Sequence, residues 1–324
     1  MRENIINNIR YRLRSIPLYV RARSFMNYGL YRQYEKWKYE SKILKSNPII
    51  TQSLSEDFSS SNPCSVRMLL TDADFMMGLW TLKSFYCHSE VDWPLIIHEG
   101  SKLADRTRNL IKFHFPNVKM IDYESSSILV NDYLRANNLL SLLFYRDKVI
   151  FFRRFVDYGL YYPSKIELWL DTDVLFFSTP TDIINNVINR TRYPIVNKDC
   201  ICSYSLPVQD LSNYFSLDVK EFVNAGLALI PREIIDLKFI DQICSKNLIP
   251  PDFYSEQTCL ALLFCQKSGQ FFSQKYVMDT IPIDLKLKNI VSRHYAGKTI
   301  SRYLYFREGI PFLLKSDRFA KLFK

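Results

Sequence analysis

The sequence has few of the residues that mark several common functional classes. Eight glycines in 324 residues form no Gly-rich loop of the kind that cradles phosphates. The seven scattered cysteines include one close pair, Cys200 and Cys202, but no partner pair for a zinc site, so reduced thiols in a reducing compartment are expected. No apolar run of about 18 residues could span a membrane, and the Arg-rich start lacks a signal peptide's apolar core. These absences predict a cytoplasmic protein, attached at most to a membrane surface.

The net charge of +10 is concentrated at the two ends of the chain. Residues 1–45 carry eleven Lys and Arg against three acids, residues 298–324 carry seven against two, and the remainder sums to −3. A body without positive excess does not attract the phosphates of nucleic acid, which disfavours nucleic acid as a partner. Basic ends suit contact with an anionic membrane surface.

Apolar residues recur at helical spacing in two stretches of the basic start, Ile5–Ile16 and Met26–Leu44. Basic amphipathic helices either lie in a membrane interface or dock on their own domain, and both interpretations stay open. Residues 46–63 are rich in Ser, Asn and Pro without periodicity, which is typical of a linker. The expected division is a basic helical extension over 1–45, a linker over 46–63, a catalytic domain over 64–297 and a basic tail over 298–324.

Apolar runs alternate with helical stretches after Cys64. The order is a strand over Val66–Thr71, a helix over Phe75–Tyr86, a strand over Leu95–His98, a helix over Leu103–Phe113 and a strand over Val118–Ile121. Alternation of this kind predicts βαβ units and a parallel sheet in an α/β fold. A long helical region, about 127–161, then leads to another buried strand, Ile166–Leu170.

Two Asp-x-Asp triplets occur, Asp72-Ala-Asp74 and Asp171-Thr-Asp173, and only the second has apolar runs on both sides. Its acids follow a predicted strand, at the sheet edge where ligands bind in open α/β folds. Two carboxylates one residue apart at a bend can hold a hard divalent cation that bridges to a diphosphate. The alternative is a solvated turn after a strand.

Several short motifs stand in an order that resembles one family, the glycogenin-like and bacterial lipopolysaccharide galactosyl- and glucosyltransferases. The motifs are Thr71-Asp-Ala-Asp-Phe75, Leu82-Lys-Ser84, an upstream Arg, Leu170-Asp-Thr-Asp173, Asn224-Ala-Gly226 and His294-Tyr-Ala-Gly297-Lys298. The family consists of retaining enzymes of the GT-A fold, and the resemblance spans roughly Val66–Lys298. It implies a Rossmann-like mixed sheet flanked by helices.

The resemblance implies a cation, Mn²⁺ or Mg²⁺, bound by Asp171, Asp173 and His294. A lone histidine is more often structural, but the glycine and lysine that follow His294 match the family's motif. The chain then departs from the pattern, because Thr299-Ile-Ser-Arg302 replaces the expected Lys-Pro-Trp ending. Lys298 is the remaining candidate for contact with the diphosphate.

The resemblance also implies a nucleoside pocket, with uridine as the base. Thr71, Asp72 and Phe75 would line it, and Phe75 stands where tyrosine is commoner. The family has a basic residue facing the donor on the helix before Asp-x-Asp. Arg154 fits this position, and the adjacent Arg153 is the alternative.

The donor sugar would be met by two further motifs. Gly226 would let the backbone approach the sugar, and the amide of Asn224 can orient a hydroxyl, although an ordinary turn into a strand explains both. Glu256 and Gln257 begin a helix where the family has an acidic-amide pair beside the reacting sugar. An acid at a helix start is also favourable without any catalytic role.

The expected reaction transfers a hexose from a UDP-linked sugar to a hydroxyl of a glycan, glycolipid or other acceptor, with retained configuration. One rival, a nucleotidyl or phosphoryl transferase, needs acids for a second metal or a phosphate-binding glycine loop. The other rival is a non-catalytic, membrane-binding adaptor built on a degenerate transferase domain. Intact acids at Asp171 and Asp173 argue against such decay.

Overall fold

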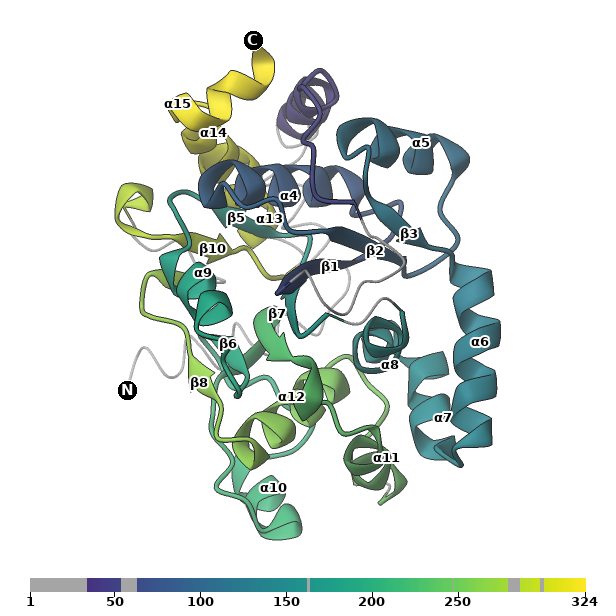
Figure 1. Ribbon diagram of the computed structural model, residues 1–324. Helices are drawn as coiled ribbons and strands as arrows, with labels where there is room; N and C mark the ends of the chain where they lie inside the picture. Colours follow the sequence, from purple (N-terminus) through teal and green to yellow (C-terminus); the bar gives the residue numbers. More distant parts are fainter. Residues whose placement is uncertain (1–33, 54–62, 162–163, 247, 279–285, 298–299) are drawn as a thin grey trace.

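The computed structural model describes residues 34–53, 63–161, 164–246, 248–278, 286–297 and 300–324. A seven-stranded mixed sheet forms the centre, and helices cover both of its faces (Figure 1). The strands lie in the order β3 (Lys119–Ile121), β2 (Leu95–Glu99), β1 (Cys64–Leu70), β4 (Ile166–Leu170), β7 (Val223–Pro231), β6 (Ile195–Lys198) and β8 (Gln270–Phe271). The predicted α/β class with a Rossmann-like mixed sheet is confirmed.

Two hydrophobic cores lie on opposite faces of this sheet. After residue 63, the described α-helices are α4 (Phe75–Ser89), α5 (Asp105–His114), α6 (Tyr123–Ala136), α7 (Leu140–Lys148), α8 (Arg153–Leu160), α9 (Thr181–Ile188), α10 (Val208–Phe215), α11 (Leu237–Ser245), α12 (Ser255–Gln266), α13 (Ile300–Leu304), α14 (Ile310–Leu313) and α15 (Asp317–Ala320). Side chains of α4 pack in one core, and those of α8, α11 and α12 pack in the other. Strands covered on both faces must be apolar throughout, which explains the continuous apolar runs in the sequence.

Strand direction brings several chain segments to one edge of the sheet. β1 runs parallel to β2 and β4, whereas β7 runs antiparallel to both β4 and β6. The amino end of β7 therefore meets the carboxyl ends of β4 and β6. A second sheet of three strands, β5 (Val174–Phe176), β10 (Ser292–His294) and β9 (Tyr276–Met278), begins directly after this edge.

The described part of the C-terminal segment, 300–324, packs on α4. Phe319 is fully buried and stacks on Trp80 with ring centroids 5.5 Å apart. Tyr305 is also fully buried, and its hydroxyl donates to the carbonyl of Met77. A segment whose sequence suggests a basic tail thus supplies side chains to the same core as residues 64–297.

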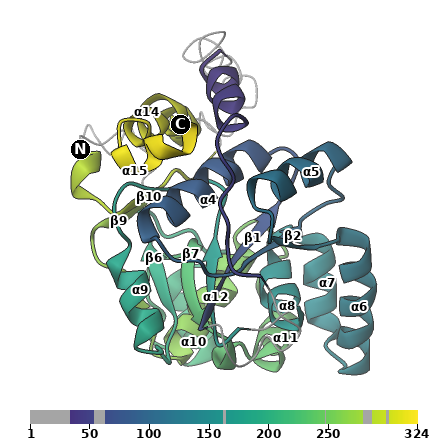
Figure 2. The ribbon, with the colours of Figure 1, turned by 45° about the horizontal axis from the view of Figure 1, so that its top comes forward.

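The described part of the N-terminal extension also lies on the domain. Helical residues 34–43 bury Tyr39 and Ile43, and the Tyr39 ring meets Trp80 edge-on. Figure 2 shows this helix beside α14 and α15. Of the two interpretations left open, docking describes these residues, and the stretch Ile5–Ile16 lies outside the described part of the chain.

Residues 46–53, part of the expected linker, lie against the domain. The Lys83 ammonium donates to the carbonyl of Asn47, and the Ile49 amide donates to the carbonyl of His114. The Asn47 amide donates in turn to the carbonyl of Leu322 at 2.7 Å. This stretch therefore connects the N-terminal helix, α4, α5 and the C-terminal end.

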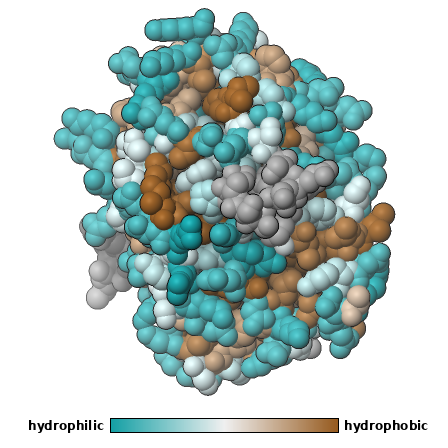
Figure 3. All heavy atoms as spheres, viewed as in Figure 1, coloured by the Kyte–Doolittle hydropathy of each residue, from teal (hydrophilic) through white to brown (hydrophobic). Residues whose placement is uncertain are grey.

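The outer surface on the face of Figure 3 is mostly hydrophilic, and its apolar side chains form separate patches. Within the described residues, no helix combines the length and apolarity that crossing a membrane requires. All seven cysteines are free in the structure, and Cys200 and Cys202 are exposed.

Candidate active site

The candidate site lies in the turn between the two sheets. Asp171 directly follows β4, and its amide donates to the carbonyl of Gly226 at 2.8 Å. Asp173 directly precedes β5, whose first residue, Val174, pairs with His294 of β10. The antiparallel pairing of β5 and β10 thus brings His294 beside acids that are more than a hundred residues away in sequence.

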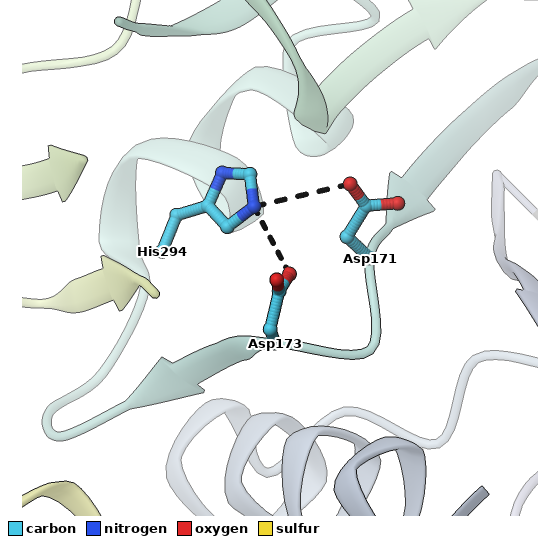
Figure 4. A group of neighbouring side chains, drawn as sticks. All are labelled: Asp171, Asp173 and His294. Atoms are coloured by element: carbon cyan, nitrogen blue, oxygen red, sulfur yellow. Dashed lines mark ion pairs between the residues drawn. The ribbon is translucent and has the colours of Figure 1, made fainter. Parts of the chain in front are cut away.

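Asp171, Asp173 and His294 point toward one another (Figure 4). His294 Nε2 lies 3.0 Å from Asp173 Oδ1 and 3.9 Å from Asp171 Oδ2. The imidazole is buried, whereas the side chains of Asp171 and Asp173 are 26% and 14% exposed, so the cluster opens on its carboxylate side. These three residues form the one group of at least three possible ligands within a metal-sized sphere among the described residues.

The two carboxylates of this cluster each have a basic partner, Arg154 for Asp171 and His294 for Asp173. Burial raises the pKa of Asp171 although the Arg154 guanidinium opposes this shift. Burial would also raise the pKa of Asp173, but the charge of His294 and its hydrogen bond outweigh burial and lower that pKa. Burial lowers and Asp173 raises the pKa of His294, and the net result is a raised pKa. The two carboxylates therefore favour a positive charge between themselves and Nε2 of His294, either the proton of the imidazolium or a bound cation in its place.

The cluster fits a hard divalent cation. One ligand atom from each residue can be chosen so that all three lie within 4.8 Å of one another. Ligands about 2.1 Å from an octahedral ion are at most about 4.2 Å apart, so an ion would draw the cluster together only slightly. Three protein ligands leave about three positions for other oxygens. The residues predicted as metal ligands are thus brought together in a suitable set.

Asn224 supports the cluster from β7. Its Oδ1 accepts the Gly226 amide at 2.9 Å and lies 3.0 Å from His294 Nδ1. Gly226 is needed because a Cβ there would lie 2.7 Å from His294 Nδ1 and 2.8 Å from Asp171 Oδ2. The glycine, expected to admit a donor sugar, is the residue that makes room for the two metal-ligand candidates.

Arg154, and not Arg153, faces the cluster. Arg154 is buried, forms an ion pair with Asp171 and donates to the carbonyl of Ala225 at 3.0 Å. Arg153 points to Asp157. Adjacent residues lie about 100° apart around a helix, so only one of the two can face the cluster. The sequence alone did not show which one, because it does not give the orientation of the helix.

Glu256 lies beyond Arg154, and their side chains approach to 3.6 Å. Glu256 is buried, and one of its oxygens has no hydrogen-bond partner within the described residues. Burial raises the pKa of Glu256 to about 7, because Arg154 offsets only part of the desolvation and Asp171 adds repulsion. An acid with these properties next to the cluster is typical of a functional carboxyl.

Asp199 is a member of the site that the sequence analysis missed. It is buried after β6, and its Oδ2 accepts from Asn224 Nδ2 at 3.1 Å and from Gln257 Nε2 at 3.2 Å. Gln257 Oε1 also lies 3.3 Å from Asn224 Nδ2. The available signal was the acid directly after the apolar start of β6, the same pattern that marked Asp171.

The candidates for the nucleoside pocket lie between β1 and α4. Thr71 donates to Asp74, and the Asp72 carboxylate accepts the Ala104 amide at 3.1 Å. Phe75 is 5% exposed and belongs to the core on the α4 side. Lys298 lies outside the described residues.

No family model matches the chain, and no curated protein matches its sequence. Its structure is similar to that of the bifunctional glycosyltransferase WbbM, with a TM-score of 0.52 and 14% identity over 84% of this chain and 53% of WbbM. It is also similar to the galactosyltransferase LgtC in complex with donor and acceptor sugar analogues, with a TM-score of 0.50 and 16% identity over 80% of this chain and 94% of LgtC. An LgtC active-site mutant gives a TM-score of 0.51 at 14% identity.

These similarities show the fold. The mixed α/β architecture is that of GT-A glycosyltransferases. The chain spans about half the length of WbbM.

Proposed function

We propose that this chain is a metal-dependent glycosyltransferase that transfers a hexose from a nucleotide diphosphate sugar to a hydroxyl. The observation that carries the proposal is the convergence of Asp171, Asp173 and His294 at the ligand-binding edge of a GT-A sheet. A divalent cation held there would stabilise the negative charge of the departing diphosphate. Manganese is the proposed ion and Mg²⁺ its alternative.

The groups next to the cluster suit recognition of a sugar. Asn224, Gln257 and Asp199 form a connected network of amide and carboxylate groups that hydroxyls can join. Arg154 would hold the Asp171 carboxylate in place and neutralise part of the negative charge of the two aspartates. Burial raises the pKa of Glu256 to about 7, so its protonated form would donate a hydrogen bond to the donor or exchange a proton with it.

The finer assignments of donor and acceptor form part of the proposal. The motif Thr71-Asp-Ala-Asp-Phe75 supports a uridine nucleotide through its resemblance to retaining transferases. We propose that Thr71, Asp72 and Phe75 serve the nucleoside and that Gly226 borders the donor sugar. A glycan or glycolipid hydroxyl is the proposed acceptor, with retention of configuration.

The rival nucleotidyl or phosphoryl transferase is less well supported. Such enzymes often use two metal ions, but the described residues contain a single cluster suited to a metal. A degenerate adaptor would have no need for the buried hydrogen bonds that orient Asn224 and His294. The site geometry therefore favours an enzyme.

We propose that the described parts of the two basic ends form one surface that contacts an anionic membrane. The N-terminal helix and the C-terminal end of the chain lie close together, since the Lys42 ammonium is 5.3 Å from the centre of the Phe323 ring. Trp37 is 64% exposed on the same helix. We define the terminal basic surface by its exposed members Lys38, Lys42, Lys45, Lys315, Lys321 and Lys324. A membrane contact of this kind would suit a glycolipid acceptor.

A screen of nucleotide sugars tests the proposed function. Thermal unfolding is measured with each nucleotide sugar, with and without Mn²⁺, and release of the nucleoside diphosphate is followed without acceptor. We expect a UDP-sugar to raise the melting temperature only with metal, because binding to the folded state stabilises it. Asp171→Asn and Asp173→Asn should abolish both effects while the proteins stay folded. No response to any nucleotide sugar, or full turnover in both variants, would reject the proposal.

A further inference from the structure

Arg302 of α13 connects the C-terminal segment to the start of α4. Its Nη2 donates to Asp74 Oδ1 at 3.0 Å, and the other oxygen of Asp74 accepts the hydroxyl of Thr71 at 3.2 Å. The sequence separation between Arg302 and Asp74 is 228 residues. An arginine from the end of the chain thus lies beside the motif proposed to bind the nucleoside.

The guanidinium of Arg302 is only partly used by this contact. Its side chain is 33% exposed, and its Nε is buried without a hydrogen-bond partner among the described residues. A guanidinium has five N–H donors in a planar fork that matches phosphate oxygens. Arg302 therefore has donors available for a second anionic group.

Helix α4 connects the position of Arg302 to the proposed metal site. The Asp171-Thr-Asp173 turn packs on α4, because the hydroxyl of Thr81 donates to the carbonyl of Thr172 at 2.7 Å. The Thr172 side chain also lies beside Gly78, about one helical turn after Asp74, since a Cβ at Gly78 would be 3.5 Å from its methyl carbon. A diphosphate that joins a nucleoside near Thr71 to a cation at Asp173 would pass next to this guanidinium.

We propose that Arg302 binds the diphosphate of the donor and that Asp74 holds the guanidinium in place before the donor arrives. This inference rests on the proposed function. It assigns to Arg302 a contact for which the sequence offered Lys298. Asp74 and the diphosphate would share the guanidinium, because its five N–H groups can serve both anions.

Binding of UDP in the presence of Mn²⁺ tests this role by isothermal titration calorimetry. Arg302→Ala should raise the Kd about tenfold to a hundredfold, the usual effect of losing a charge-assisted hydrogen bond. Arg302→Lys keeps the positive charge and should raise the Kd by a smaller factor than Arg302→Ala. Asp74→Asn removes the charge that holds the guanidinium in place, so its Kd should rise, but by less than in Arg302→Ala. Lys298→Ala should change the Kd less than Arg302→Ala.

The alternative is a purely structural ion pair between Arg302 and Asp74. In that case Arg302→Ala and Asp74→Asn would lower the melting temperature to a similar extent, and neither would change the Kd for UDP. A matched control is Arg318→Ala, which breaks the ion pair with Glu90 at the far end of α4, about 20 Å along the helix. This control should leave UDP binding unchanged.

The possible failures are distinguishable. If wild type binds UDP and Arg302→Ala, still folded, binds it equally well, Arg302 has no role at the diphosphate and the proposed function stands. If wild type binds neither UDP nor any other nucleoside diphosphate with Mn²⁺, the proposed function fails and this inference fails with it. A larger loss in Lys298→Ala than in Arg302→Ala would reassign the contact to Lys298.

Discussion

The contact between His294 Nδ1 and Asn224 Oδ1, at 3.0 Å, determines which nitrogen of the imidazole faces the carboxylates. The Asn224 amide nitrogen donates to Asp199, so its oxygen must point toward His294. That oxygen accepts, and Nδ1 must therefore carry a proton. A neutral His294 then presents the lone pair of Nε2 to Asp171 and Asp173, as a metal ligand must.

Replacement of His294 by alanine should weaken binding of Mn²⁺ without destroying the nucleotide pocket. Loss of one of three ligands should raise the Mn²⁺ midpoint of donor turnover at least about tenfold, and high metal should restore part of the activity. Asn224→Ala keeps His294 but removes the hydrogen bond that orients its ring, so it should raise the Mn²⁺ midpoint by a smaller factor. If His294 is merely a buried structural residue, its replacement would lower the melting temperature and leave the midpoint of the folded enzyme unchanged.

A methyl group at position 226 should disturb the metal site more than the fold. Gly226→Ala would push the His294 ring and the Asp171 carboxylate apart, because the new Cβ would overlap both. We expect a raised Mn²⁺ midpoint together with a lowered melting temperature. Gly269→Ala is the matched control, since its Cβ would crowd the ring of Phe264 and no metal-ligand candidate. Equal Mn²⁺ midpoints in the two variants would contradict the role given to Gly226.

The sequence predicted the elements of the site better than the contacts between them. Asp171 was recognisable because a buried strand ends at a polar turn, and local patterns of this kind are visible in sequence. The meeting of His294 with Asp173 depends on the register of β5 and β10, which no local pattern encodes. Asp199 has the local signal of an acid after an apolar run, but its contact with Asn224 depends on the antiparallel pairing of β6 with β7.

The amino-acid composition of the C-terminal end did not predict that this segment packs on the domain. Residues 300–324 carry many basic side chains, and their apolar positions do not form a long regular pattern. The short helices hold together because Tyr305 and Phe319 insert into a core already formed by α4. A charge count describes the outer face of such a segment and not the few side chains that anchor it.

The stacking of Phe319 on Trp80 predicts that the C-terminal segment stabilises the whole domain. Phe319→Ala should lower the free energy of unfolding by about 3 kcal/mol, the cost of removing a fully buried aromatic ring. Chemical denaturation followed by circular dichroism measures this change. Phe113→Ala, at a ring that is 56% exposed, should cost much less. A loss below about 1 kcal/mol for Phe319→Ala would indicate that the segment is a dispensable tail.

The terminal basic surface should bind anionic vesicles in a salt-dependent manner. Vesicles that contain phosphatidylserine should sediment the protein at low salt, and binding should fall as the salt concentration rises, because screening weakens contact between surface charges. Reversal of Lys42 and Lys321 to glutamate should reduce binding several-fold. Reversal of the exposed Lys102 and Lys238 is the control with an equal change in net charge. Equal losses in both pairs, or binding insensitive to salt, would contradict a specific surface.

The buried carboxyl of Glu256 should make the stability of the metal-free protein depend on pH. Burial raises its pKa from 4.5 to about 7, so the folded protein holds this proton more tightly than the unfolded chain does. The resulting stabilisation is complete below about pH 4.5 and is lost as the pH rises through 7. Glu256→Gln carries a neutral group at every pH and should not show this loss. Relative to wild type, the free energy of unfolding of the variant should therefore gain on the order of 2 kcal/mol between pH 5 and pH 8.

Urea denaturation at each pH, with EDTA present, measures this difference in the free energy of unfolding. Glu124→Gln, at a side chain 61% exposed, is the control and should follow wild type. Parallel curves for wild type and Glu256→Gln would mean that Glu256 is already ionised in the folded protein at pH 5. Such a result would remove the basis for a neutral, hydrogen-bond-donating acid beside Arg154.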